Sequence, residues 1–223
     1  MTAGFWVQAR SVADRDLLRE RRRGEVLWIT IPFGVIALLL VPLAVGTDIP
    51  LLRRIGPGLF WVIVMLFGVL VAVRQANTDS PAQRDAAALL GLDPAASFVG
   101  QTLTSALLLV GFEVLVGIAA VAFYDLPLQG WPWLLVVFPL VALGLALLGT
   151  LAGSIVSSVN AGTALVPLLV APLSVPLLLA ATQALEGLRL GRSILSWLLL
   201  MATVVLVLAI VGVLTARPLQ ETR

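Results

Sequence analysis

Residues 194–216 read ILSWLLLMATVVLVLAIVGVLTA and contain no charged side chain. A helix needs about 20 apolar residues to cross a bilayer core roughly 30 Å thick, so this run is long enough to span a membrane. It lies in a chain of 223 residues, of which 60% are hydrophobic and 12% are charged, with a mean hydropathy of +1.08. A soluble protein could not cover so apolar a chain with polar surface. The sequence therefore predicts an all-α, polytopic membrane protein.

Six transmembrane helices are expected, at residues 26–46, 55–73, 98–123, 133–157, 163–185 and 194–216. The fifth carries Pro167, Pro172 and Pro176. Because proline lacks a backbone N–H and clashes with the preceding turn, we expect this span to be kinked or partly unwound. Five spans and a re-entrant segment are the alternative. The predicted organisation is an amphipathic segment (1–24), one transmembrane domain (25–217) with a coupling loop at about 74–97, and a short tail (218–223).

The basic residues predict how the chain is oriented. All 14 are Arg, and most fall before the first span, between the second and third spans, or in the tail. Only four fall on the opposite side: Arg53, Arg54, Arg189 and Arg192. Because basic residues are retained on the cytoplasmic side, both termini are expected in the cytoplasm of a multi-pass protein of the inner or plasma membrane. The N-terminus shows no cleaved signal peptide pattern.

The absent residue types exclude several functions. The chain has no Cys, no His and no Lys, so it lacks the usual ligands of metals and haem and the lysine of a phosphate-binding loop. We therefore expect no enzyme activity, no metal site and no cofactor bound by this chain alone, with any ATP hydrolysis in a partner subunit. The Arg excess is explained by membrane topology, and no nucleic-acid partner is expected.

Two cytoplasmic segments show helical patterns. In residues 5–23, apolar side chains recur at helical spacing at Trp6, Ala9, Ala13 and Leu17. This predicts a helix in the plane of the bilayer surface, with Arg side chains held to anionic lipid; a merely helical positive flank is the alternative. In the second loop, Ser80, Pro81 and Gln83 have the spacing of a capped helix start.

That second helix would continue through Arg84, Asp85, Ala87 and Leu90 to a stop at Gly91. A short capped helix between two spans is what a transporter needs to dock on a soluble motor. An ordinary helical connector is the alternative.

Within the spans, Glu113 is the only well-embedded ionisable residue. Since a carboxyl in the membrane costs a few kcal/mol, it should face protein or water; a functional role and an interhelical hydrogen bond are both open. Small residues repeat every four positions at Gly149, Gly153 and Ser157, which favours close helix packing within one subunit, or else a dimer seam. Pro172 and Pro176 free backbone carbonyls that could line a path. Trp131 and Trp133 fit an aromatic belt, or else a platform on which haem could stack.

Three stretches resemble the cytochrome c maturation haem exporter protein B family, the membrane permease subunit of an ABC-type complex. They are RIGPGLFWV at 54–62, which contains Pro57 and Trp61, SFVGQ at 97–101, and LVAPLSVPLLLAAT at 169–182. Gln101 stands where many relatives have Lys. The resemblance places Pro57 and Trp61 among the residues of a pathway or an interhelical contact.

The same resemblance implies haem export, or release of a haem-loaded chaperone, in cytochrome c biogenesis. The implied partners are an ATPase subunit, a second copy of this chain and a haem-handling membrane protein that supplies the missing His ligands, with haem as substrate of the complex. A lipid or drug export permease and a non-transporting membrane scaffold are the rival functions.

Overall fold

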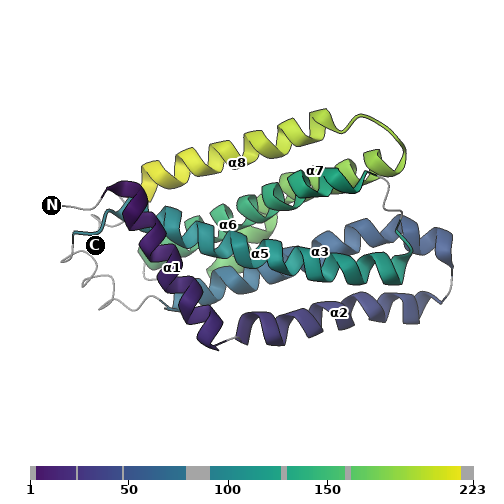
Figure 1. Ribbon diagram of the computed structural model, residues 1–223, viewed down its shortest axis with the longest axis horizontal. Helices are drawn as coiled ribbons and strands as arrows, with labels where there is room; N and C mark the ends of the chain where they lie inside the picture. Colours follow the sequence, from purple (N-terminus) through teal and green to yellow (C-terminus); the bar gives the residue numbers. More distant parts are fainter. Residues whose placement is uncertain are drawn as a thin grey trace.

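The computed structural model describes residues 4–23, 25–46, 48–78, 91–126, 130–158 and 162–216, and every regular element in these ranges is helical. The helices α2, α3, α5, α6, α7 and α8 run side by side, while α1 lies across one end of the bundle, next to the C-terminal end of α8 (Figure 1). We call this the proximal end and the opposite one the distal end. The element bounds are α1 Phe5–Arg23, α2 Glu25–Val45, α3 Ile49–Thr78, α5 Pro94–Tyr124, the 3-10 turn η1 Trp131–Trp133, α6 Leu134–Ser158, α7 Leu165–Arg189 and α8 Leu195–Ala216.

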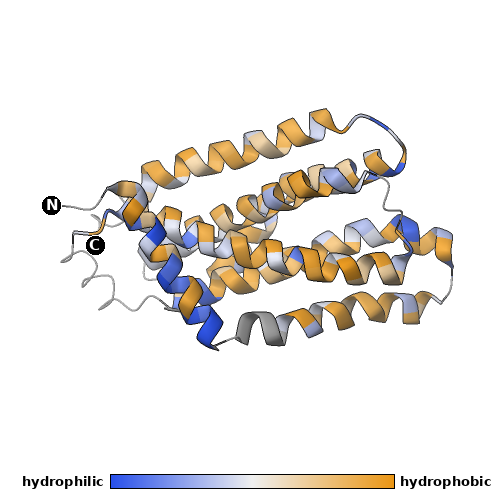
Figure 2. Ribbon diagram, viewed as in Figure 1, coloured by the Kyte–Doolittle hydropathy of each residue, from blue (hydrophilic) through white to orange (hydrophobic). Residues whose placement is uncertain are grey.

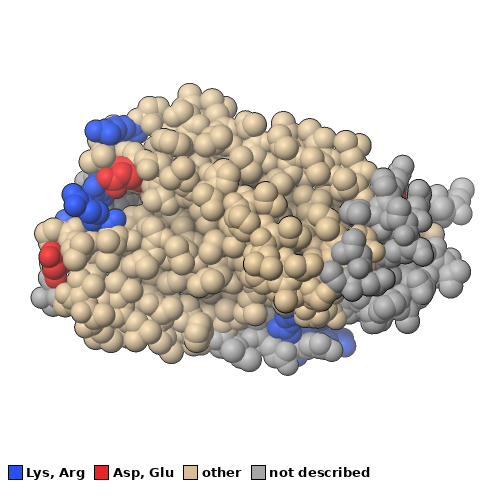
Figure 3. Space-filling view, turned by 180° about the vertical axis from the view of Figure 1, so that it is seen from behind, with Lys and Arg blue, Asp and Glu red and all other residues tan. Residues whose placement is uncertain are grey.

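Five of these helices, α3, α5, α6 with η1, α7 and α8, are long and apolar enough to cross a membrane, and α2 contributes a shorter apolar stretch, Thr30–Val45. Each predicted span coincides with one helix of the bundle. The helices of the bundle consist mostly of hydrophobic residues, and α1 is mostly hydrophilic (Figure 2). Charged side chains gather towards the two ends (Figure 3). In α3, Arg54 and Arg74 bracket an apolar stretch about 30 Å long at 1.5 Å per residue, which matches the bilayer core. The prediction of an all-α polytopic membrane protein is confirmed.

Of the expected kink or partial unwinding of the fifth span, the unwinding is wrong, because α7 is one continuous helix of 25 residues. Pro167 lies in its first turn, where the missing N–H has no partner to lose. Pro172 and Pro176 lie in its interior. The carbonyls of Leu168 and Pro172 each lose an intrahelical partner, because the residues four positions later have no N–H. Proline is nevertheless tolerated inside transmembrane helices.

The helix α6 lies at the centre of the bundle. Its most apolar window is 61% buried, against 22–50% for the other long helices, and it packs on α3, α5, α7 and α8. Gly149 and Gly153 of α6 lie against Ala72 and Ala76 of α3, where an added Cβ would be 2.8 Å and 3.5 Å from the alanine Cβ atoms. The two backbones approach closely because neither contact has a large side chain.

A buried hydrogen bond joins α2 to the rest of the bundle. Pro42 has no N–H to donate to the carbonyl of Leu38 one turn earlier. The hydroxyl of Tyr124, at the distal end of α5, donates to that carbonyl at 2.9 Å. The tyrosine ring lies over Gly56 of α3. This contact satisfies a backbone acceptor that the proline leaves free inside the membrane.

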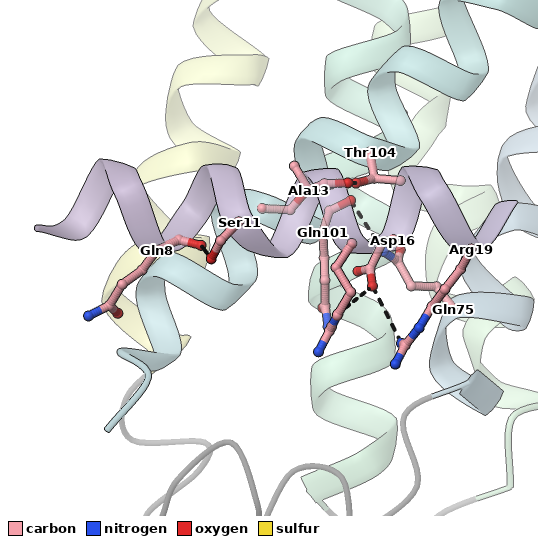
Figure 4. Close-up of polar contacts among 10 residues, drawn as sticks. Gln8, Ser11, Ala13, Asp16, Arg19, Gln75, Gln101 and Thr104 are labelled. Atoms are coloured by element: carbon pink, nitrogen blue, oxygen red, sulfur yellow. Dashed lines mark hydrogen bonds and ion pairs between the residues drawn. The ribbon is translucent and has the colours of Figure 1, made fainter. Parts of the chain in front are cut away.

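The helix α1 packs on the proximal part of α5 (Figure 4). A Cβ at Gly100 would be 2.6 Å from the carbonyl oxygen of Ala9, so only glycine permits this approach. Thr104 donates to the carbonyl of Ala13 at 3.3 Å. The predicted apolar stripe of α1 is therefore divided: Ala9 is buried against α5, while Trp6 and Leu17 remain on the exposed face.

The α3–α6 contact gives the first testable prediction. Gly149→Leu should force the two helices apart and lower the free energy of unfolding by about 1–3 kcal/mol, the usual cost of overpacking. Thermal unfolding of the purified protein in detergent measures the change. Gly111→Leu is the matched control, since no atom lies within 4 Å of a Cβ at Gly111. Equal effects of the two substitutions would contradict this packing.

Candidate functional site

Polar side chains meet inside the proximal half of the bundle. The amide of Gln75 in α3 donates to the carbonyl of Gln101 in α5 at 3.2 Å and accepts from the hydroxyl of Ser105 at 2.8 Å (Figure 4). A second link joins the hydroxyls of Thr102 and Thr150 at 3.3 Å. These bonds satisfy the buried polar groups and tie α3, α5 and α6 together. This cluster was not predicted from the sequence, although the spacing of Gln101 and Ser105 places both on one helix face.

Glu113 lies farther into the bundle, eight residues along α5 from Ser105, which is about 12 Å at 1.5 Å per residue. Its exposed fraction is 0%, so it faces the bundle interior and not lipid. Within the described ranges, neither carboxyl oxygen of Glu113 has a hydrogen-bond partner. A buried polar group without a partner costs about 1–3 kcal/mol. The interhelical hydrogen bond that could have explained this residue does not form in this conformation.

Apolar side chains pack beside Glu113. On α5, the ring of Phe112 stacks on Phe67 of α3 with centroids 3.9 Å apart, and Val116, one turn beyond Glu113, is fully buried. No group of three or more potential metal ligands occurs in the part of the chain that the structure describes. The carboxyl is therefore neither an evident metal ligand nor part of the proximal polar cluster.

Among the residues that the structure describes, the indole Nε1 of Trp61 is also buried without a hydrogen-bond partner. The tryptophan is 1% exposed and packs edge-on against Phe60 and Phe138, with centroids 4.8 Å and 5.8 Å away. Both Glu113 and Trp61 thus place an unsatisfied polar group in the core. Both residues are buried without a partner for these atoms, and their helices, α5 and α3, pack on each other.

The remaining candidates are dispersed. Pro57 lines an apolar cavity of about 610 Å³ near the distal end. Pro172 and Pro176 lie on the exposed face of α7 and do not line that cavity. Ser157 is half-buried, and its hydroxyl donates to the carbonyl of Ser154 at 3.0 Å.

The predicted coupling residues Ser80, Pro81, Gln83, Arg84, Asp85, Ala87 and Leu90 lie outside the described residues. The flanks of this segment are described, and α1 contacts both. Glu20 pairs with Arg74 of α3 at 3.9 Å. The side chain of Gln8 accepts a hydrogen bond from the N–H of Asp93 at 2.9 Å. Asp93 in turn caps the start of α5 by accepting from the N–H of Ala95. One helix therefore links the two ends of the segment.

These features define a multi-pass helical membrane protein, with a carboxyl enclosed in its bundle and an additional helix across one end. Comparison with known proteins assigns the chain more closely. Residues 7–219 match the family described as CcmB protein, and the chain belongs to this family.

Two curated relatives cover most of the chain. The heme exporter protein B of Paracoccus denitrificans is 29% identical over 196 residues, which are 86% of this chain and 88% of the relative. The heme exporter protein B of Haemophilus influenzae is 27% identical over 178 residues, covering 79% of this chain and 80% of the relative.

The unpaired carboxyl gives the second prediction. Glu113→Leu should raise the free energy of unfolding of the purified chain by about 1–3 kcal/mol, because it removes a buried polar group that has no partner. Thermal unfolding in detergent tests this. Glu20→Leu is the matched control and should not stabilise the protein, since Glu20 has Arg74 as partner. A loss of stability on Glu113→Leu would show that the carboxyl holds the bundle together.

Proposed function

We propose that this chain is the membrane permease subunit of an ABC-type complex that exports haem, or releases a haem-loaded chaperone, in cytochrome c biogenesis. The observation that carries the proposal is the family match over residues 7–219. The names of the two relatives add support. The chain has no phosphate-binding loop of the Gly-Lys-Ser/Thr type, so ATP hydrolysis belongs to a partner subunit.

In this proposal the ATPase docks on the segment between α3 and α5. The two flanks of that segment continue directly into α3 and α5, and α1 contacts both flanks through Glu20 and Gln8. A movement of the motor would therefore reach α1, α3 and α5 together. The tight contact of Ala9 with Gly100 would keep α1 and α5 moving as one body.

Glu113 is the residue at which this movement acts. A carboxyl enclosed without a partner makes the closed bundle less stable than it could be. A conformation in which α3 and α5 separate would let the carboxyl meet water or a partner, which recovers the lost interaction. The unpaired carboxyl thus favours opening of the bundle at its own position. ATP-driven movement of the coupling segment would supply the remaining free energy that opening requires.

The proposed partners follow from the family, and the composition agrees with one of them. With no His in the chain, axial ligation of haem iron falls to a haem-handling membrane protein. A second copy of this chain would complete the permease. The proposed location is the inner membrane, with the proximal end in the cytoplasm, because α1 and Arg74 place the larger share of Arg there.

The third prediction tests the function. Deleting the gene in its own host should abolish covalent attachment of haem to c-type cytochromes, measured by haem-stained gels, and a plasmid copy should restore it. A copy with Ala87→Pro should insert but neither bind the ATPase nor restore haem attachment, because proline costs a helix about 3 kcal/mol. Ala87→Ser is the control and should restore both. Normal c-type cytochromes in the deletion strain would refute the proposed function.

The fourth prediction concerns orientation. A reporter that works only in the cytoplasm should be active when fused at Arg223 and inactive at Leu126. A reporter that works only outside the cytoplasm should show the reverse. Green fluorescent protein and alkaline phosphatase at both positions measure this. The helices α6, α7 and α8 give three crossings between the two positions. The same compartment at both positions would require an even number and would contradict this arrangement.

A further inference from the structure

The distal half of the bundle contains an apolar cavity of about 610 Å³ between α3, α5, α6 and the end of α7. Three aromatic side chains line it: Phe60, Phe138 and Trp131. The rings of Phe60 and Phe138 stack with centroids 5.6 Å apart. Val114 and Ile118 line it on the lipid-facing side and are 45% and 64% exposed. A flat apolar molecule dissolved in the membrane could therefore enter from the side.

The guanidinium of Arg189 joins this apolar cavity to a second cavity that is lined by charged residues. Arg189 lines the apolar cavity and also a second cavity of about 590 Å³, which is lined by Arg53, Arg54 and Asp48 among others. Charged side chains gather at this end, and the surface next to them is uncharged (Figure 3). The apolar cavity thus ends at a cluster of three arginines.

The arginines differ in their pairing. Arg53 pairs with Asp125, and the Nε atom of Arg189 donates to Glu186 at 2.9 Å. Arg54 forms no ion pair within the described ranges of the chain. A guanidinium has five N–H donors, so Arg189 can bind a further carboxylate while it holds Glu186. The cluster is suited to anionic groups attached to an apolar body.

We propose that this composite site binds a tetrapyrrole dicarboxylate, with the ring among the aromatic side chains and the carboxylates at Arg189 and its neighbours. The inference rests on the proposed function and names the place on this chain where its substrate is held. A cavity of this size is within the range of small-molecule sites. Its aromatic lining and arginine end match the two halves of such a molecule.

The composition determines whether this site can ligate a central metal. The whole chain lacks His and Cys, and none of its 3 Met lines the cavity. The site therefore recognises the ring and its carboxylates and offers no such ligand to a central metal. Protoporphyrin containing iron, zinc or no metal should bind equally well. A partner that ligates iron would then take over the iron form by a contact that this site does not provide.

The test measures binding of zinc protoporphyrin to the purified chain in nanodiscs of phosphatidylcholine, by fluorescence anisotropy with empty nanodiscs subtracted. Metal-free protoporphyrin and haem, which competes for the same site, should bind with the same affinity. Val114→Trp fills the cavity and should abolish binding. Val207→Trp is the matched control, since Val207 is 53% exposed on α8 and does not line the cavity; binding should be unchanged.

A second pair of variants tests the charge. Arg189→Gln should weaken binding about tenfold, the loss expected for one charge-assisted hydrogen bond. Arg192→Gln, at an arginine that lines neither cavity, should leave binding unchanged. This pair keeps the proposal testable if Val114→Trp fails to fold.

Several outcomes would overturn the proposal. These are no saturable binding, binding of the iron form alone, or equal effects of the variants and their controls. Loss of binding in nanodiscs containing phosphatidylglycerol would identify a site for anionic lipid instead. If zinc protoporphyrin fails to bind while the chain still supports haem attachment to c-type cytochromes in its host, this inference fails and the proposed function stands.

Discussion

A spanning helix has no water available for its backbone or buried polar side chains, and the arrangement of this protein follows from that constraint. The proline at position 42 would leave the carbonyl of Leu38 without a partner, and the hydroxyl of Tyr124 provides one. The amide of Gln75 finds partners in α5. Hydroxyls within α6 and α7 donate to carbonyls of their own helix. The polar groups of the bundle are thus either satisfied or placed at its ends.

Within the described residues, the carboxyl of Glu113 and the indole Nε1 of Trp61 are the exceptions. Glu113 carries the larger polar group. It is fully buried, and no partner reaches it within the ranges that the structure describes. A group that destabilises one conformation without compensation favours any conformation that relieves it. The carboxyl lies on α5, the helix that α1 holds and that begins next to the predicted coupling segment. The buried carboxyl without a partner and the proposed entry point of ATP-driven movement are therefore on one helix.

The sequence predicted the helices well, because long apolar runs bounded by Arg, Gly and Pro determine where a spanning helix begins and ends. It also placed Glu113 away from lipid. It left open whether the prolines kink or unwind the fifth span, and α7 continues as a helix through Pro172 and Pro176. Nor could it show that Glu113 lacks a partner, or that Arg53 and Arg54 of α3 line the same cavity as Arg189 of α7. These features depend on how α3, α5 and α7 pack, which periodicity in one segment does not determine.

The absence of native cysteine permits a direct test of whether the bundle opens at Glu113. Val64 and Val116, on α3 and α5, and Val170 on α7 are all 0% exposed. Single Val→Cys variants of each would be assembled with the ATPase and treated with a membrane-impermeant maleimide, with and without ATP. The account predicts that all three are protected without ATP and that positions 64 and 116 react when ATP is added, while position 170 stays protected. Protection of positions 64 and 116 in both conditions, in a complex that hydrolyses ATP, would contradict it.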